Sequence, residues 1–291
     1  MSTVSELSHL IALLDDPDET VSHVVSNKIM NFGLPVTGFL KKELRKSNNN
    51  VLTNRLEHLI TNIELDHLFK EIEKWSKEPD PELIMGLCLI SNVISHESDS
   101  AHITDTLFNM AKEVWVEMND SQTLVEKIEI YNHIFYHRIG FRMKDPFLID
   151  FQKAQLHNAI EIKQANPVLL GLLYIAIAQL AGIPIGAVAF PGGYIPACLR
   201  KDGQVLFYIN ICQSGEIFGH DQLLTILNNY GFSFPPEKFT TCNALSLTDI
   251  FAESLYFITG SIGDKELERR MEYTLTFFGD ERLLFIEEDD E

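Results

Sequence analysis

Basic side chains are scarce in this sequence. Against 42 Asp and Glu there are only 23 Lys and Arg, which gives a formal net charge of −19. The deficit runs through both halves, because residues 1–120 hold 20 acidic and 10 basic side chains and residues 121–291 hold 22 and 13. With no basic patch to neutralise phosphate groups, we expect no binding to nucleic acid and none to an anionic membrane surface.

Cysteine is also rare. The four thiols, Cys88, Cys198, Cys212 and Cys242, are widely and irregularly spaced, which excludes a zinc knuckle and a disulfide framework. The first residues carry no positively charged segment and turn acidic early, unlike a signal peptide. These features predict free thiols and a location in the reducing cytoplasm.

A long hydrophobic run occurs between Val168 and Phe190, and 23 such residues could span a bilayer. However, Gly182-Ile183-Pro184 would break a helix in the middle of this run, and Ile185–Phe190 suits a buried strand. We therefore favour a buried segment of a globular protein over membrane insertion.

The stretch from Asn166 to Asn210 organises the rest of the chain. Its pattern predicts a buried helix over 167–181 and then three short strands, over 185–190, 194–200 and 205–210. Asp202-Gly203, between the last two strands, is a strong hairpin signal. A helix followed by an antiparallel meander predicts an α+β core with a small antiparallel sheet.

Helical patterns flank this core on both sides. Apolar residues recur at helical spacing throughout residues 7–118, and the phrase LLDDPDETV followed by a helix resembles a HEAT-type repeat. An ordinary helical bundle remains the alternative. After the core, a helical pair over 247–262 and 265–277 resembles a tetratricopeptide-type hairpin, and the acidic residues 287–291 suggest a disordered tail. We expect three parts: a helical HEAT-like domain (1–118), the core (119–235), and a C-terminal helical pair with the acidic tail (236–291).

The predicted core resembles the transglutaminase-like superfamily, and within it the bacterial invasion-regulator-type branch, which carries a tetratricopeptide-like tail. The residues that carry this resemblance are Asn166-Pro167, Leu172-Leu173-Tyr174, Gly182-Ile183-Pro184, Phe190-Pro191 and Phe207-Tyr208-Ile209-Asn210. A loop at Asn132-His133, followed by Asp145-Pro146, also fits. The resemblance covers residues 120–235 well and the helical flanks only in outline.

Enzymes of this superfamily use a Cys, His and Asp triad, which the resemblance places at the start of the buried helix, at the start of the second strand and on the third strand. A thiol at the helix start is activated by the helix dipole, and an oriented imidazole takes its proton. Here the helix starts Asn166-Pro167-Val168-Leu169, without a thiol, Gly193 stands where the His is expected, and Asn210 where the Asp is expected. The resemblance therefore implies that no catalytic residue remains.

Two other groupings could carry chemistry. If the hairpin is centred on Asp202-Gly203, Cys198 pairs with Phe207 and Cys212 with Gly193, so Cys198 and Cys212 face opposite ways. Cys212 could then act with His220 as a displaced nucleophile, although a strand-end thiol and a turn histidine explain both residues equally well. His133 and His137 have metal-ligand spacing, but with no third ligand at a matching offset we interpret them as surface histidines and expect no metal and no cofactor.

The sequence favours a catalytically inactive transglutaminase-like protein that binds a protein or peptide partner, or a small ligand in the vestigial cleft. The cleft is expected beside Asn166, Gly193, Tyr194, Asn210 and Cys212. The alternative is a cysteine hydrolase or acyltransferase whose nucleophile is Cys212, and a third possibility is a structural subunit of a larger assembly.

Overall fold

The computed structural model describes residues 3–95, 99–143, 150–190, 193–229 and 239–279. The chain divides into two compact units, one ending at Glu73 and the other beginning at Lys74. This division does not coincide with the boundary expected near residue 119. The helices that follow Lys74 pack with the C-terminal part of the chain, as described below.

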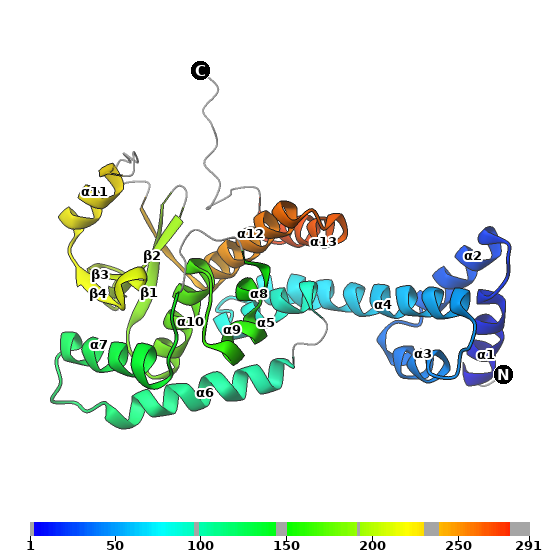
Figure 1. Cartoon of the computed structure of the whole chain (residues 1–291), viewed down its shortest axis with the longest axis horizontal. Coiled ribbons are helices and arrows are strands. Elements are labelled where there is room, and N and C mark those ends of the chain that lie inside the picture. Colours follow the sequence, from blue (N-terminus) through cyan, green and yellow to red (C-terminus); the bar gives the residue numbers. More distant parts are fainter. Residues whose placement is uncertain (1–2, 96–98, 144–149, 191–192, 230–238, 280–291) are drawn as a thin grey trace, which may run out of the picture. The chain divides into compact units, whose positions relative to one another are not determined.

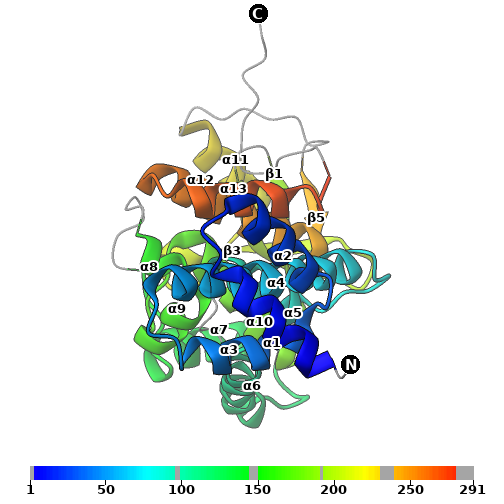
Figure 2. The same ribbon diagram turned by 90° about the vertical axis from the view of Figure 1, so that its right-hand side faces the viewer.

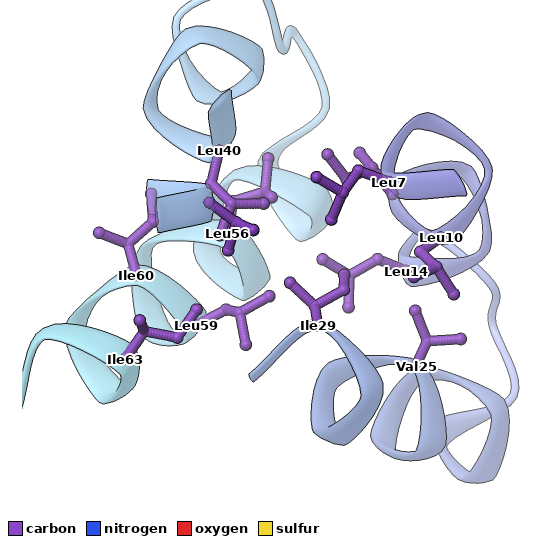
Figure 3. Packing of buried hydrophobic residues seen from close by; sticks show 12 residues of the cluster. Leu7, Leu10, Leu14, Val25, Ile29, Leu40, Leu56, Leu59, Ile60 and Ile63 are labelled. Carbon is purple, nitrogen blue, oxygen red and sulfur yellow. The ribbon is translucent and has the colours of Figure 1, made fainter. Parts of the chain in front are cut away.

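The N-terminal unit is built from four helices: α1 (Thr3–Leu14), α2 (Glu19–Met30), α3 (Thr37–Leu44) and the part of α4 (Asn50–Ser76) up to Glu73. Asp18 caps α2, because its carboxylate accepts a hydrogen bond from the Thr20 N–H at 2.8 Å. The apolar residues of the four helices and of the 3₁₀ turn Leu34–Val36 meet in one core (Figure 3), which holds Leu7, Leu10, Ile11, Leu14, Val25, Ile29, Val36, Leu40, Leu56, Leu59, Ile60 and Ile63. The expected helical content of this region is confirmed, since no strand occurs within 3–95 or 99–118.

A single arginine ties the turn between α1 and α2 to α4. Nη1 of Arg55 donates to the carbonyl oxygens of Leu14 at 2.7 Å and Asp16 at 2.8 Å. These carbonyls lie at and just beyond the end of α1, where helix carbonyls lack intrahelical partners. α4 runs without a break, because it contains neither proline nor glycine to interrupt it.

The second unit is organised around α10 (Pro167–Leu180), in which every residue from Leu169 to Ala178 is buried. Pro167 occupies the first turn, where its missing N–H costs nothing. At the other end, Gly182 has φ +78°, its N–H donates to the Gln179 carbonyl, and the next N–H donates to the Ala178 carbonyl. This is a Schellman C-cap, which ends the helix as the sequence predicted.

The sheet is small, antiparallel and five-stranded, in the order β4-β3-β2-β1-β5. Three of its strands match the predicted ones closely: β1 (Ile185–Phe190), β2 (Gly193–Leu199) and β3 (Val205–Asn210). The turn between β2 and β3 holds Gly203 at φ +84°. The sequence did not reveal the three-residue strands β4 (Glu216–Phe218) and β5 (Thr240–Cys242), because they are too short to show a period.

The remaining helices surround this core (Figure 1): α5 (Leu83–Ile94), α6 (Ser100–Glu117), α7 (Leu124–Asn132), α8 (Phe151–Ala154), α9 (Leu156–Ile162), α11 (His220–Asn229), α12 (Ala244–Ile262) and α13 (Lys265–Leu275). A π-helical turn, His133–Arg138, continues α7. α6 packs on α10, and α5 packs on α12 and α13. The expected helical pair at the C-terminal end is α12 and α13, which form a hairpin (Figure 2).

Two features expected from the sequence, the linker at Pro235-Pro236 and the acidic tail at 287–291, lie outside the described residues.

All four cysteines are free thiols, as the sequence predicted. No helix in the described ranges has both the length and the apolar character needed to cross a bilayer.

Candidate functional site

Asn166 fixes the start of α10. Its side-chain oxygen accepts a hydrogen bond from the Leu169 N–H at 2.8 Å, and the residue is 8% exposed. An asparagine in this position satisfies one of the free N–H groups of the first helical turn. The helix start therefore carries a structural cap and a proline, with no nucleophile among its first residues.

Tyr194 lies against this helix start. Its hydroxyl donates to the Val168 carbonyl, and burial raises the pKa of Tyr194 well above its ordinary value. The close approach depends on Gly171, because a Cβ atom added there would lie 2.3 Å from the Tyr194 hydroxyl oxygen. Tyr194 thus serves first to join β2 to α10.

Asn210 holds the turn that follows β3. Its Oδ1 accepts from the Cys212 N–H at 3.0 Å, and its Nδ2 donates to Oε1 of Gln213 at 3.0 Å. The predicted pairing of Cys212 with Gly193 is wrong, because β3 ends at Asn210 and residues 211–213 form a 3₁₀ turn. The pairing of Cys198 with Phe207, predicted from the same hairpin, is confirmed.

A pocket of about 260 Å³ opens between the start of α10, the strands β2 and β3, and α11. We call it the Tyr194 pocket. Its lining is mostly apolar and consists of Pro167, Val168, Gly171, Gly193, Tyr194, Ile195, Pro196, Ile209, Asn210, Ile211, Cys212, Phe218, Leu223 and Ile226. The structure thus brings four of the five predicted cleft residues together at one pocket. Asn166, the fifth, does not line the pocket, although its neighbour Pro167 does.

Cys212 is exposed as a residue, but its thiol borders this apolar pocket. The partial burial raises the pKa of the Cys212 thiol above its ordinary value. The proposed partner His220 is engaged elsewhere, because its Nδ1 lies within hydrogen-bond distance, 3.1 Å, of the Tyr208 hydroxyl. The raised pKa disfavours the thiolate form of Cys212 at neutral pH.

The sequence did not reveal how the loop 211–215 is held. Nδ2 of Asn132 donates to the Gly215 carbonyl at 2.8 Å, and its Oδ1 accepts from the Tyr174 hydroxyl at 2.6 Å. The Tyr136 hydroxyl donates to the Ile211 carbonyl at 3.3 Å. Asn132 was expected in a loop, but it ends α7. The signal available in the sequence was the four-residue spacing of Asn132 and Tyr136, which places both on one helical face.

The two histidines with metal-ligand spacing lie close together on the surface. His133 and His137 are exposed, with ring centroids 5.4 Å apart. No group of three or more His, Cys, Asp or Glu in the described ranges could hold a metal ion. We keep the interpretation of these two residues as surface histidines.

The cleft is expected to tolerate change where the buried helix does not. Gly193 lacks a positive φ, and an added Cβ would lie 3.1 Å from the Phe190 ring, which has to move by a few tenths of an ångström. We therefore expect Gly193→His to fold within about 1 kcal/mol of the parent. Ala176→Phe, at a residue 2% exposed in α10, overpacks the core and costs about 1–3 kcal/mol or more.

Thermal melting of the two variants beside Gly193→Ala tests this expectation. The alanine variant separates the cost of the Cβ atom from that of the imidazole. If Gly193→His proves more damaging than Ala176→Phe, the correspondence between Gly193 and the family histidine is wrong.

Comparisons with known proteins agree with this core. A family model described as the transglutaminase-like superfamily matches residues 101–250. A curated UPF0162 protein of Vibrio cholerae serotype O1 is 24% identical over 144 residues, which cover 49% of this chain and 52% of that protein. The chain thus spans about half the length of this curated relative. No solved structure matches the chain.

Proposed function

Because this chain belongs to the transglutaminase-like superfamily, we propose that it is a catalytically inactive member that binds a protein or peptide partner at the Tyr194 pocket. One observation supports the proposal: the positions that we match to the family triad hold Asn166-Pro167, Gly193 and Asn210. In this chain the helix cap and the turn cap use both amide side chains for structure. No imidazole replaces the family histidine.

We further propose that the chain belongs to the bacterial invasion-regulator-type branch and acts in the cytoplasm. In this proposal the HEAT-like helices α1–α4 and the tetratricopeptide-like hairpin α12–α13 are also available to bind partners. The net charge of −19 supports a protein or peptide partner over nucleic acid. A structural subunit of a larger assembly is the third candidate, and it would also bind protein.

The rival function is a cysteine hydrolase or acyltransferase that uses Cys212. Its support is the place of Cys212 on the pocket lining. Against it stands the raised pKa of the thiol, because the thiolate is the reactive form.

The activity test uses the full chain with generic peptide and glutamine substrates, and with Cys212→Ala as the matched variant. We expect no turnover of either substrate. Turnover that Cys212→Ala abolishes would overturn the proposal in favour of the cysteine enzyme.

Alkylation of Cys212 by iodoacetamide, followed by peptide mass spectrometry across pH, gives a second measurement. A raised pKa keeps the thiol protonated, so the rate should rise with pH through a midpoint above the ordinary thiol value of about 8.5. A rate already at its plateau below pH 7 would reveal an activated thiolate.

A further inference from the structure

Beside the Tyr194 pocket, the strands β2 and β3 diverge. We call the region between residues 194–196 of β2 and residues 209–211 the fork. β2 pairs with β1 along its whole length, from Ile185–Cys198 to Phe190–Gly193. Its pairing with β3 covers only Ala197–Leu199. Within the described residues, the N-terminal half of β2 therefore has one neighbouring strand, and the pocket occupies the space where the second strand departs.

Pro196 explains why the ladder ends there. If the register continued by one residue beyond Ala197–Tyr208, Pro196 would face Ile209, and a proline has no N–H to donate to the Ile209 carbonyl. Proline is rare inside a sheet for this reason. Beyond this point β3 continues its pairing with β4, at Ile209–Ile217 and Asn210–Glu216, and then turns away through residues 211–213.

The direction of the free main-chain groups follows from the pairing on either side. The Leu199 N–H donates to the Pro184 carbonyl at the start of β1. Because main-chain groups of successive strand residues point to opposite edges, Leu199, Ala197, Ile195 and Gly193 point toward β1. Tyr194 therefore points its N–H and C=O into the fork, where no strand among the described residues pairs with it.

The pocket beside this edge has the size and chemistry of an anchor site. Its volume of about 260 Å³ lies just below the roughly 300–1,000 Å³ of ordinary small-molecule pockets. None of its lining residues is an Asp, Glu, Lys, Arg or His. Leu223 and Ile226 of α11 form one wall and Ile195 of β2 another, so an uncharged apolar side chain fits there.

We infer that the fork of β2 and β3 binds an extended peptide, which pairs with the main chain of Tyr194 and places one apolar side chain in the Tyr194 pocket. This inference rests on the proposed binding function and specifies how the partner is held. A strand satisfies both free groups of Tyr194 at once, as in other cases of β-strand addition. In the bound peptide, the residue next to the one that pairs with Tyr194 projects its side chain to the sheet face that carries Ile195, toward Leu223 and Ile226. The net charge of −19 disfavours an acidic peptide.

The test selects peptides from a phage-displayed library of random heptapeptides on the immobilised full chain and synthesises the enriched sequences. Each peptide is then made in versions with a single N-methyl group at successive main-chain nitrogens. Paired residues alternate along a strand, so we expect affinity to fall about tenfold at one or more nitrogens and to stay unchanged at the residues immediately beside them. Replacing the anchoring apolar residue by aspartate should abolish binding.

A matched pair of protein variants locates the binding. Ile226→Trp fills the pocket from α11, whereas Asn228→Trp adds the same side chain at an exposed position of α11 outside the pocket lining. We expect the first variant to lose binding and the second to keep it. Circular dichroism of both variants confirms that α11 and the sheet are intact.

The outcomes separate the inference from the function on which it rests. Peptides that Ile226→Trp excludes but that no N-methyl group weakens would overturn strand addition and leave binding at the pocket standing. Selection that yields no peptide, or peptides that bind Ile226→Trp as well as the parent, would overturn both.

Discussion

Replacing Gly215 by alanine is expected to lower the free energy of unfolding of the second unit by about 3 kcal/mol. Gly215 has φ +82°, a conformation that costs an L-residue about 1 kcal/mol or more. The added Cβ would also lie 2.0 Å from Oδ1 of Asn132. Asn132 must then move, which breaks its hydrogen bonds to the Gly215 carbonyl and the Tyr174 hydroxyl.

Gly203→Ala is the matched control for this experiment. Gly203 has φ +84°, but no atom lies within 4 Å of the added Cβ, so it measures the backbone cost alone. Both tryptophans, Trp75 and Trp115, belong to the second unit, so urea unfolding followed by their fluorescence reports on this unit. Equal losses in the two variants would show that crowding against Asn132 costs nothing.

The second large effect is expected at Gly171. On an exposed helix, Gly→Ala stabilises by about 1 kcal/mol through helix propensity. In α10 the sign should reverse, to a loss of about 2 kcal/mol, because the new Cβ would displace the Tyr194 hydroxyl from its hydrogen bond to the Val168 carbonyl.

A double-mutant cycle with Tyr194→Phe tests the cause. The Tyr194→Phe substitution removes the hydroxyl oxygen, which is the atom closest to the Cβ added at Gly171. The ring carbon 3.1 Å from that Cβ remains. Gly171→Ala should therefore cost clearly less in the Tyr194→Phe background than in the parent. If its cost is the same in both backgrounds, Tyr194 is not what requires a glycine at this position.

The sequence was informative where one pattern determines the structure. In α10, a continuous apolar run between Asn166-Pro167 and Gly182-Ile183-Pro184 defines both ends of a buried helix, and the helix begins at Pro167 and is capped at Gly182 as predicted. The Asp202-Gly203 turn likewise set the register at Cys198–Phe207. The α+β core with its antiparallel meander was predicted from these signals.

Where several segments meet, the sequence was less informative. The pairing of β2 with β3 stops before Pro196, which has no N–H to donate, so the register could not be extended to Gly193 and Cys212. The placement of α5 and α6 beside α12 and α10 depends on long-range packing, which helical periodicity does not reveal. Four of the predicted cleft residues line the pocket. The role of Asn132 could not be predicted, because it depends on a contact with Gly215, which is distant in the sequence.

The strand order also bears on how the sheet forms. β1 to β4 follow one another along the chain and in the sheet, so each new pair closes a short loop. β5 is different, because Thr241 pairs with Val188, 53 positions earlier. Closing a long loop costs more chain entropy than closing a turn. The pairing of β5 with β1 therefore costs more chain entropy than the hairpin of β2 and β3.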